Sequence, residues 1–222
     1  IPIILNVVVP PPNGQPVNIP MAALSYLSFG GCSWLATRVL DGRRDGLPLA
    51  WNIPLAMVLT AAALGVSAGD VVVCSTGLIG QRLPLDTLLA GVDAGVRALS
   101  ADGGQDAAVA IKTTDTVTKT AVSAGDGWTV GGMAKGAGML APGMATMLCV
   151  ITTDAVVAPQ QLDAALREAV RTTLNRADSD GCMSTNDTVV LMSSGASGAA
   201  PEQTEFQEGL RAVCADLARQ LI

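Results

Sequence analysis

The 222-residue sequence contains no histidine, and this absence removes the commonest catalytic machinery. Without an imidazole group, neither a Ser-His-Asp triad nor a Cys-His dyad can form, and no zinc site can use His ligands. Any nucleophile in this chain must therefore rely on a different base.

Aromatic and charged residues are also scarce, at 3% and 14% of the chain. Hydrophobic residues still make up 50% of the sequence, so the core must be built from Ala, Val, Leu and Gly. Ordinary domains carry about 25% charged residues, and so lean a surface suggests that a partner subunit or missing chain covers much of it. The net charge of −6, with no Lys/Arg cluster, argues against nucleic acid binding.

No apolar run reaches the length needed to span a membrane, and no basic segment precedes an apolar stretch as in a signal peptide. The cysteines are odd in number, widely spaced and without a Cys-x-x-Cys pair, which is typical of free thiols in a reducing compartment. They are Cys32, Cys74, Cys149, Cys182 and Cys214. The Asp-x-Asp-Gly run at Asp178 lacks the closing Glu of a calcium loop and is interpreted as a turn. We expect a cytoplasmic protein that binds neither membrane nor metal.

The most distinctive stretch begins with five glycines and a proline within residues 131–143. Glycine is used where the backbone turns sharply or approaches another group closely. The apolar run at residues 147–151 follows directly and is typical of a strand buried on both faces. Thr146 stands between a flexible glycine track and a rigid strand, where a chain could place a nucleophile. On composition alone, a simple tight connection is the more usual explanation of such a pattern.

Residues 131–147, Gly-Gly-Met-Ala-Lys-Gly-Ala-Gly-Met-Leu-Ala-Pro-Gly-Met-Ala-Thr-Met, resemble the self-cleavage segment of the bifunctional ornithine acetyltransferase (glutamate N-acetyltransferase) family of arginine biosynthesis. In that family the protein breaks the bond before the threonine, which then becomes the catalytic nucleophile. The resemblance implies cleavage between Ala145 and Thr146, followed by acetyl transfer through Thr146.

Further motifs extend the resemblance. Residues 75–80, Ser-Thr-Gly-Leu-Ile-Gly, resemble a second family signature, which implies an oxyanion hole formed by Thr76 and Gly77. The run Lys-Thr-Thr-Asp resembles the substrate segment of the family, with Thr113 at the binding position, and Lys135 matches a lysine that contacts substrate. Taken alone, these residues would be interpreted as a strand-to-helix turn, a helix or turn cap, and a solvated loop lysine. A third motif, Ser-Thr-Asn-Asp-Thr, covers residues 184–188.

Hydrophobic periodicity predicts a mixed α/β fold with layered mixed sheets and helices outside, and the resemblance implies a self-processing, N-terminal-nucleophile-like arrangement. Prolines confine the strands near the N-terminus to edges. Strands are expected at residues 3–5, 7–9, 70–74, 116–122, 147–151 and 189–192, with a hairpin turn at 125–127 and a returning strand that begins at 128–130. Helices are expected at residues 55–64, after Pro84, after Pro159 and at 201–222.

The resemblance covers about residues 57–222, and residues 1–56 have no counterpart in it. We therefore expect an unmatched N-terminal segment, 1–56, and an acetyltransferase core, 57–222, that spans the junction at Ala145 and Thr146. The family has a further stretch after the segment that corresponds to the last helix here, and it brings acidic, Asn and Ser/Thr groups to the site. Relative to the family, the core is expected to be incomplete.

The implied reaction is a ping-pong acetyl transfer from N-acetylornithine to glutamate, without a cofactor and with acetyl-CoA as an optional co-substrate. After cleavage, the α-amine of Thr146, with an ordinary pKa of roughly 7.7–8.0, can act as the base for its own hydroxyl. The two self-cleaved chains would form a hetero-oligomer. Two alternatives remain open: an N-terminal-nucleophile amidase or aminopeptidase, and a catalytically silent fragment.

Overall fold

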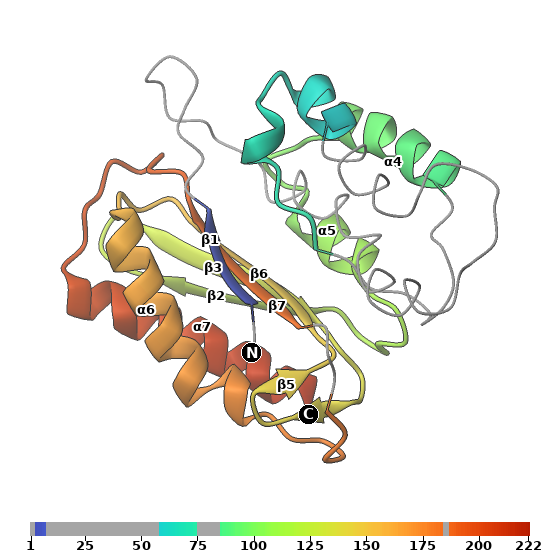
Figure 1. Cartoon of the computed structure of the whole chain (residues 1–222). Helices are drawn as coiled ribbons and strands as arrows, with labels where there is room; N and C mark the ends of the chain where they lie inside the picture. Colours follow the sequence, from blue (N-terminus) through green and yellow to red (C-terminus); the bar gives the residue numbers. More distant parts are fainter. Residues whose placement is uncertain (1–2, 8–57, 75–84, 184–186) are drawn as a thin grey trace. The chain divides into compact units, whose positions relative to one another are not determined.

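The structure is a computed structural model that describes residues 3–7, 58–74, 85–183 and 187–222 (Figure 1). The chain divides into two compact units, residues 1–19 with 108–222, and residues 20–107. Helices and strands occur together in the first unit, which confirms the predicted α/β class.

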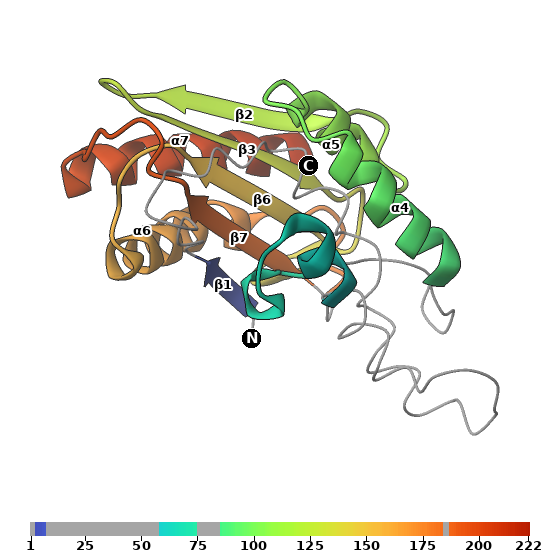
Figure 2. The same cartoon turned by 90° about the horizontal axis from the view of Figure 1, so that it is seen from above.

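The first unit is built on one five-stranded mixed sheet in the order β1-β7-β6-β3-β2 (Figure 2). Strands β2, β3 and β6 pair antiparallel, whereas β6, β7 and β1 pair parallel. Their bounds are β1 Ile3–Val7, β2 Lys119–Ala124, β3 Thr129–Lys135, β6 Leu148–Thr153 and β7 Thr188–Ser193. The edge position of β1 confirms the expectation for residues 3–5, and most of the remaining N-terminal segment lies outside the described residues.

Strand β6 follows the predicted junction and lies in the middle of the sheet. All of its residues except Thr152 are buried, as expected for a continuous apolar run between two neighbours. The β2–β3 hairpin also forms where predicted: the N–H of Gly125 donates to the carbonyl of Trp128 at 2.9 Å, and Gly127 adopts φ +76°. That positive φ explains the glycine at the turn.

The first part of the glycine-rich stretch is a strand and not a loop, which corrects the expectation of a flexible track from residue 131. Residues 131–135 belong to β3 and are buried. A Cβ atom on Gly132 would lie 3.1 Å from Leu217 Cδ1 and 3.2 Å from Ile151 Cγ1. Glycine at this position therefore lets a helix pack closely on the sheet.

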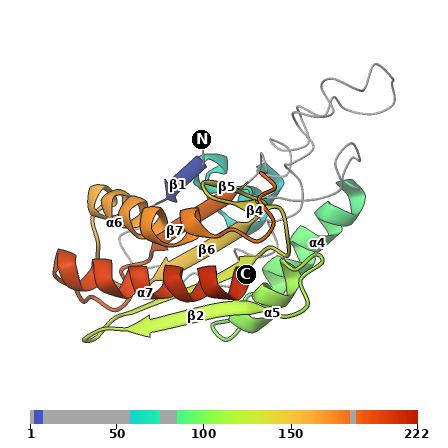
Figure 3. The same ribbon diagram turned by 90° about the horizontal axis from the view of Figure 1, so that it is seen from below.

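Helices α6 (Pro159–Thr172) and α7 (Gln203–Leu221) lie side by side on one face of the sheet (Figure 3). Both predicted apolar stripes are buried, and the core lies between these stripes and the strands. Trp128 and Phe206 contact each other at a tilt of 47°, with ring centroids 5.6 Å apart, and Trp128 Nε1 donates to Glu205 at 3.1 Å. Among the described residues, this aromatic pair packs in a core otherwise made of small and aliphatic side chains.

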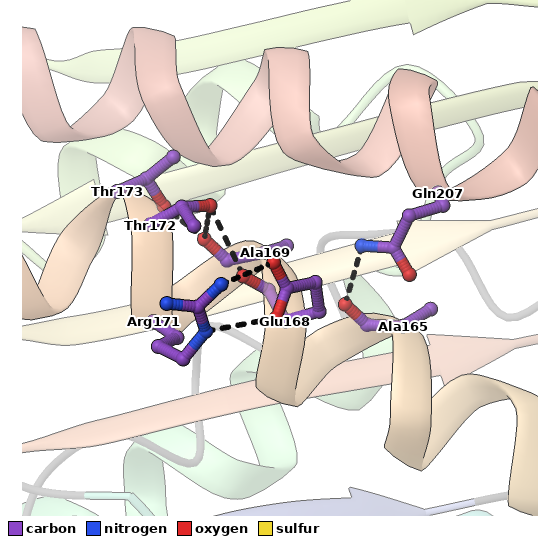
Figure 4. A network of polar contacts seen from close by, with 7 residues as sticks. All are labelled: Ala165, Glu168, Ala169, Arg171, Thr172, Thr173 and Gln207. Carbon is purple, nitrogen blue, oxygen red and sulfur yellow. Dashed lines mark hydrogen bonds and ion pairs between the residues drawn. The ribbon is translucent and has the colours of Figure 1, made fainter. Parts of the chain in front are cut away.

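Polar contacts tie the two helices together and close the end of α6 (Figure 4). Gln207 Nε2 on α7 donates to the carbonyl of Ala165 on α6 at 3.0 Å. The hydroxyl of Thr173 donates to the carbonyl of Ala169 at 2.6 Å, and Arg171 pairs with Glu168 one turn earlier. The Thr173 hydroxyl therefore satisfies the Ala169 carbonyl, which the last turn of the helix leaves without an N–H partner.

The second unit is helical where it is described. Residues 58–64 form a helix that ends at Gly65, with φ +69°, as predicted for a C-terminal cap. Helix α4 spans Leu85–Arg97, as expected after Pro84, and α5 spans Gly104–Ala110. The expected strand at 70–74 is wrong: Asp70 closes the 3₁₀ helix η2 (Ala68–Asp70) by accepting from the N–H of Ser67 at 3.2 Å.

Helix α5 was not expected from the sequence. Within the described segments, no helix combines the length and the hydropathy that crossing a bilayer requires.

Candidate active site

A small hairpin separates β3 from β6 and carries the predicted cleavage junction. Strands β4 (Leu140–Ala141) and β5 (Met144–Ala145) pair antiparallel. Pro142 and Gly143 form the turn between them, and the φ of +74° at Gly143 suits the Pro-Gly pair of a type II turn. The peptide bond between Ala145 and Thr146 therefore lies where this ribbon meets the central strand of the sheet.

The hydroxyl of Thr146 is buried without a hydrogen-bond partner among the described residues. An unsatisfied buried hydroxyl costs about 1–3 kcal/mol, and such groups are rare in folded proteins. Its Oγ1 atom is separated from the Ala145 carbonyl carbon only by Cβ, Cα and N of Thr146 itself. A hydroxyl nucleophile without a partner among the described residues thus lies where it could form a five-membered ring with the preceding carbonyl carbon.

Three hydrogen bonds fix the backbone around this junction. The N–H of Thr146 donates to the carbonyl of Met139 at 2.8 Å, and the N–H of Ala145 donates to Asp187 Oδ2 at 3.4 Å. On the other side, the N–H of Thr188 donates to the carbonyl of Met147 at 3.1 Å. Every residue from Ala145 to Met147 is therefore held.

Met139 adopts a left-handed conformation, with φ +55°, which is unfavourable for a side chain of its size. Its N–H donates to Asp180 Oδ2 at 2.8 Å, and Ser179 N–H donates to the carbonyl of Leu140 at 2.9 Å. Bonds from the backbone N–H groups of Met139 and Cys182 lower the pKa of Asp180. The turn predicted at Asp178 is thus present. Its contacts hold Met139, whose carbonyl accepts the N–H of Thr146.

Lys135 is buried in β3, with 3% of its surface exposed. This finding rules out the alternative interpretation of a solvated loop lysine. At the next residue, a Cβ atom on Gly136 would lie 3.1 Å from the Thr146 carbonyl oxygen and 3.0 Å from Leu221 Cδ2. Glycine here permits a close backbone approach to Thr146, as expected for part of the glycine-rich stretch.

Asp115 connects the segment that carries Thr113 to the end of β3. Its carboxylate accepts from Lys119 Nζ at 2.5 Å, from the N–H of Gly136 at 2.7 Å and from the N–H of Thr113 at 3.3 Å. Burial alone would raise the pKa of Asp115, but these bonds outweigh it and hold the pKa below its ordinary value. A continuous set of contacts therefore runs from Thr113 through Asp115 and Gly136 to Thr146.

The predicted residues divide into those that the structure brings together and those that it does not describe. Ala145, Thr146 and Lys135 lie at one end of the sheet, and the exposed Thr113 joins them through Asp115. Thr76 and Gly77 lie outside the described residues, as do residues 184–186 of the third motif.

Two of the thiols in the described part of the chain, those of Cys74 and Cys214, are poor nucleophiles. Burial raises the pKa of Cys74 to about 11 and that of Cys214 to about 12, so both thiols stay protonated near neutral pH. No group of three or more Cys, Asp or Glu side chains in the described ranges is arranged to hold a metal ion.

Sequence reasoning named the motifs but missed the acids within them. Asp115 ends the Lys-Thr-Thr-Asp run and Asp187 belongs to Ser-Thr-Asn-Asp-Thr, yet only Thr113 was selected. An Asp beside backbone that must be held at a turn is a usable signal, because its carboxylate accepts N–H groups. No signal in the sequence marked Met139.

The fold and the junction together define an α/β domain with a buried, unpaired threonine hydroxyl at a braced Ala-Thr bond. The ArgJ family model matches residues 52–222, and the chain belongs to this family. The arginine biosynthesis bifunctional protein ArgJ 1 of Streptomyces clavuligerus is 66% identical over 162 residues, covering 73% of this chain and 42% of that protein. The ArgJ protein of Streptomyces coelicolor is 65% identical with the same coverage, and that of Mycobacterium leprae is 59% identical over 169 residues.

The chain spans about two fifths of the length of these curated relatives, since it covers 42% of each. Among solved structures, it is similar to ornithine acetyltransferase complexed with ornithine from Mycobacterium tuberculosis. That match has 37% identity and a TM-score of 0.42, covering 58% of this chain and 73% of the other. The ArgJ structure from Bacillus halodurans matches at 24% identity with a TM-score of 0.38, covering 60% and 74%.

Proposed function

We propose that this chain is part of an acetyltransferase of arginine biosynthesis that cleaves itself between Ala145 and Thr146 and then carries the acetyl group on Thr146. The observation that supports this most is the buried Thr146 hydroxyl, which has no partner in the described part of the chain and lies at the end of a hairpin whose backbone is held on both sides. Membership of the ArgJ family agrees with it.

Cleavage begins when Oγ1 of Thr146 attacks the carbonyl carbon of Ala145. A C–O bond forms, the C–N bond breaks, and the proton of the hydroxyl passes to the departing nitrogen, which leaves an ester and a free α-amine. Water then hydrolyses the ester to the Ala145 carboxylate and the regenerated hydroxyl. Close positioning replaces a strong base in this step, since effective molarities of well-oriented groups are very large.

Acetyl transfer then uses the same hydroxyl with the new α-amine of Thr146 as its base. The acetyl carbonyl of N-acetylornithine acylates Thr146, ornithine leaves, and the amine of glutamate takes the acetyl group. Thr76 and the N–H of Gly77 would stabilise the tetrahedral oxyanion, a contribution of about 3–4 kcal/mol per donor. Acetyl-CoA would be an alternative acetyl donor at the same hydroxyl.

Lys135 and Thr113 are the proposed substrate contacts. The Lys135 ammonium suits a substrate carboxylate as a point charge, and Lys135 precedes Gly136, whose backbone lies close to the Thr146 carbonyl. Asp115 keeps the Thr113 segment at the same strand end. The proposal also includes a cytoplasmic location and an assembly of the two cleaved chains.

The test is the intact mass of the purified chain under denaturing conditions, with Thr146→Ala and Thr146→Ser as matched variants. We expect fragments that meet at Ala145 and Thr146 in the parent and Ser variant, and one 22.4 kDa species in the Ala variant. Incubation with N-acetylornithine should then add one acetyl mass to the fragment that begins at Thr146.

Either of two results would contradict the proposal and favour one of the alternative functions. A parent chain that remains at 22.4 kDa through prolonged incubation would favour a catalytically silent fragment. Acetyl groups that pass to water at the same rate with and without glutamate would favour an amidase.

A further inference from the structure

Asp187 lies next to the cleavage junction but has no assigned role. Its side chain is buried, with 8% of the residue exposed, and Oδ2 accepts the N–H of Ala145 at 3.4 Å. A hydrogen bond of this length offsets little of the free energy that it costs to remove a carboxylate from water, so the contact stabilises the fold poorly. Burial accordingly raises the pKa of Asp187. Fold stability alone therefore gives a weak reason for an acid at this position.

The two peptide planes that flank Ala145 are held by different partners. Asp187 binds the N–H of Ala145 and so orients the plane before this residue, whereas Met139 binds the N–H of Thr146 and orients the plane after it. The angle between these planes is set by the backbone torsions of Ala145, so holding both planes keeps the Ala145 carbonyl from rotating. The approach of Thr146 Oγ1 to that carbonyl carbon then depends on the backbone torsion and the rotamer of Thr146 itself.

The residue after Asp187 completes this arrangement. The N–H of Thr188 donates to the carbonyl of Met147, so two consecutive residues hold the chain on either side of Thr146. Because Thr188 begins β7, which pairs with β6 along its length, the Asp187 carboxylate is carried on the rigid sheet.

We propose that Asp187 is a positioning residue for self-cleavage, which holds Ala145 in the conformation that its own neighbour Thr146 attacks. This inference rests on the proposed self-cleavage. The role assigned to Asp187 is one of position and not of proton transfer, since Thr146 Oγ1 has no hydrogen-bond partner among the described residues, Asp187 included. Its role is to limit rotation about Ala145 before any bond is made.

The test follows cleavage of newly synthesised full chain in a cell-free reaction, with fragments measured against time. Asp187→Ala removes the acceptor and should slow cleavage by about tenfold, the usual effect of one hydrogen bond to a carboxylate. Asp187→Asn keeps an oxygen that can accept the Ala145 N–H and should recover most of the rate. A role that depended only on the negative charge would leave Asn as slow as Ala and would overturn the proposal.

Asp154→Ala is the matched control. Asp154 Oδ1 also accepts one backbone N–H, that of Thr129 at 2.6 Å, but it follows the far end of β6. Its variant should cleave at the parent rate. Urea unfolding of each Asp variant in a Thr146→Ala background shows whether the two lose comparable stability.

Hydroxylamine separates the two chemical steps, because it cleaves the ester but not the peptide bond. If Asp187 positions Ala145 for attack, hydroxylamine leaves the Asp187→Ala rate unchanged. Full rescue by hydroxylamine would place Asp187 in ester hydrolysis and overturn the inference. Parent-rate cleavage in Asp187→Ala would also overturn it while self-cleavage stands, whereas an uncleaved parent chain would remove both proposals together.

Discussion

Asp115 is the residue on which the polar contacts near the end of β3 converge. Its side chain is fully buried, and that of its partner Lys119 is 6% exposed. Removing one member of a buried ion pair leaves an uncompensated charge, so we expect Asp115→Ala to cost about 3–5 kcal/mol of unfolding free energy. Urea denaturation in a Thr146→Ala background measures this loss.

The exposed pair of Asp163 and Arg167 on α6 provides the comparison for Asp115. It has the same i,i+4 spacing, yet water surrounds both side chains. Asp163→Ala should leave the urea midpoint nearly unchanged. Equal losses in the two variants would contradict a special role for burial at Asp115.

Lowering the pH should reveal how much the ionised Asp115 contributes to stability, without any mutation. Because the folded pKa of Asp115 is below its ordinary value of about 3.9, the ionised carboxylate stabilises the fold above that pH. This contribution is lost as the pH falls from about 4 through the folded pKa. In a plot of the free energy of unfolding against pH, Asp115→Asn should therefore reduce the slope at acid pH. An unchanged slope would contradict a lowered pKa of Asp115 in the folded state.

For single residues, the sequence predicted which residues belong to the site better than it predicted their burial and their hydrogen-bond partners. Thr146 and Lys135 were named from motifs, but the burial of Lys135 depends on β3, which crosses a stretch that composition marks as a loop. The bonds from Gly136 to Asp115, from Met139 to Asp180 and from Ala145 to Asp187 join residues 21 to 42 positions apart. Such pairings depend on topology, which local patterns do not contain.

Among the secondary structure elements, Gly132 sets how closely α7 packs on β3. An added Cβ would meet Leu217, Ile151 and the carbonyl of Val150 at 3.1–3.3 Å, and the last of these is backbone that cannot turn aside. We expect Gly132→Ala to cost about 1–3 kcal/mol through overpacking. Thermal or urea unfolding would reveal it.

Gly91→Ala in α4 is the counterpart of Gly132→Ala, because an added Cβ there meets nothing within 4 Å. The same substitution should stabilise that helix by up to about 1 kcal/mol. Opposite signs for the two variants support the close approach of α7, whereas two stabilising results would refute it.

Elements with clear hydrophobic patterns were predictable: α6 and α7 have an apolar stripe that matches one buried face, and β6 and β7 are continuous apolar runs buried on both faces. Helix α5 was not, because it starts at Gly104 directly after an Asp-Gly pair that suggests a loop. Its buried residues Ala107 and Ala108 show that packing overrides weak local preference. The strand expected at 70–74 failed because Asp70 caps a turn instead.

For the whole molecule, the strand order determines what cleavage would produce. Strands β6 and β7 come after Thr146, and they lie between β1 on one side and β3 on the other, both from the earlier part of the chain. Helix α7 also contacts the earlier part: Gln220 exchanges two hydrogen bonds with the backbone of Thr120, at 2.9 and 3.2 Å. The two pieces would share one sheet and one core.

We therefore expect the cleaved pieces to stay together. Size-exclusion chromatography in native buffer should elute them as one species at the volume of the uncleaved Thr146→Ala chain, and denaturant should separate them. Separation in native buffer would show that the sheet does not hold the fragments.

The interleaved order of the sheet also affects how the protein recovers after unfolding. Before cleavage, every strand belongs to one chain, so refolding is a first-order process whose rate is independent of protein concentration. After cleavage, β6 and β7 must find β1 and β3 by diffusion, and refolding becomes second order. A cleaved molecule would therefore fold most easily before cleavage, as a single chain. Once unfolded after cleavage, it would refold more slowly as the protein is diluted.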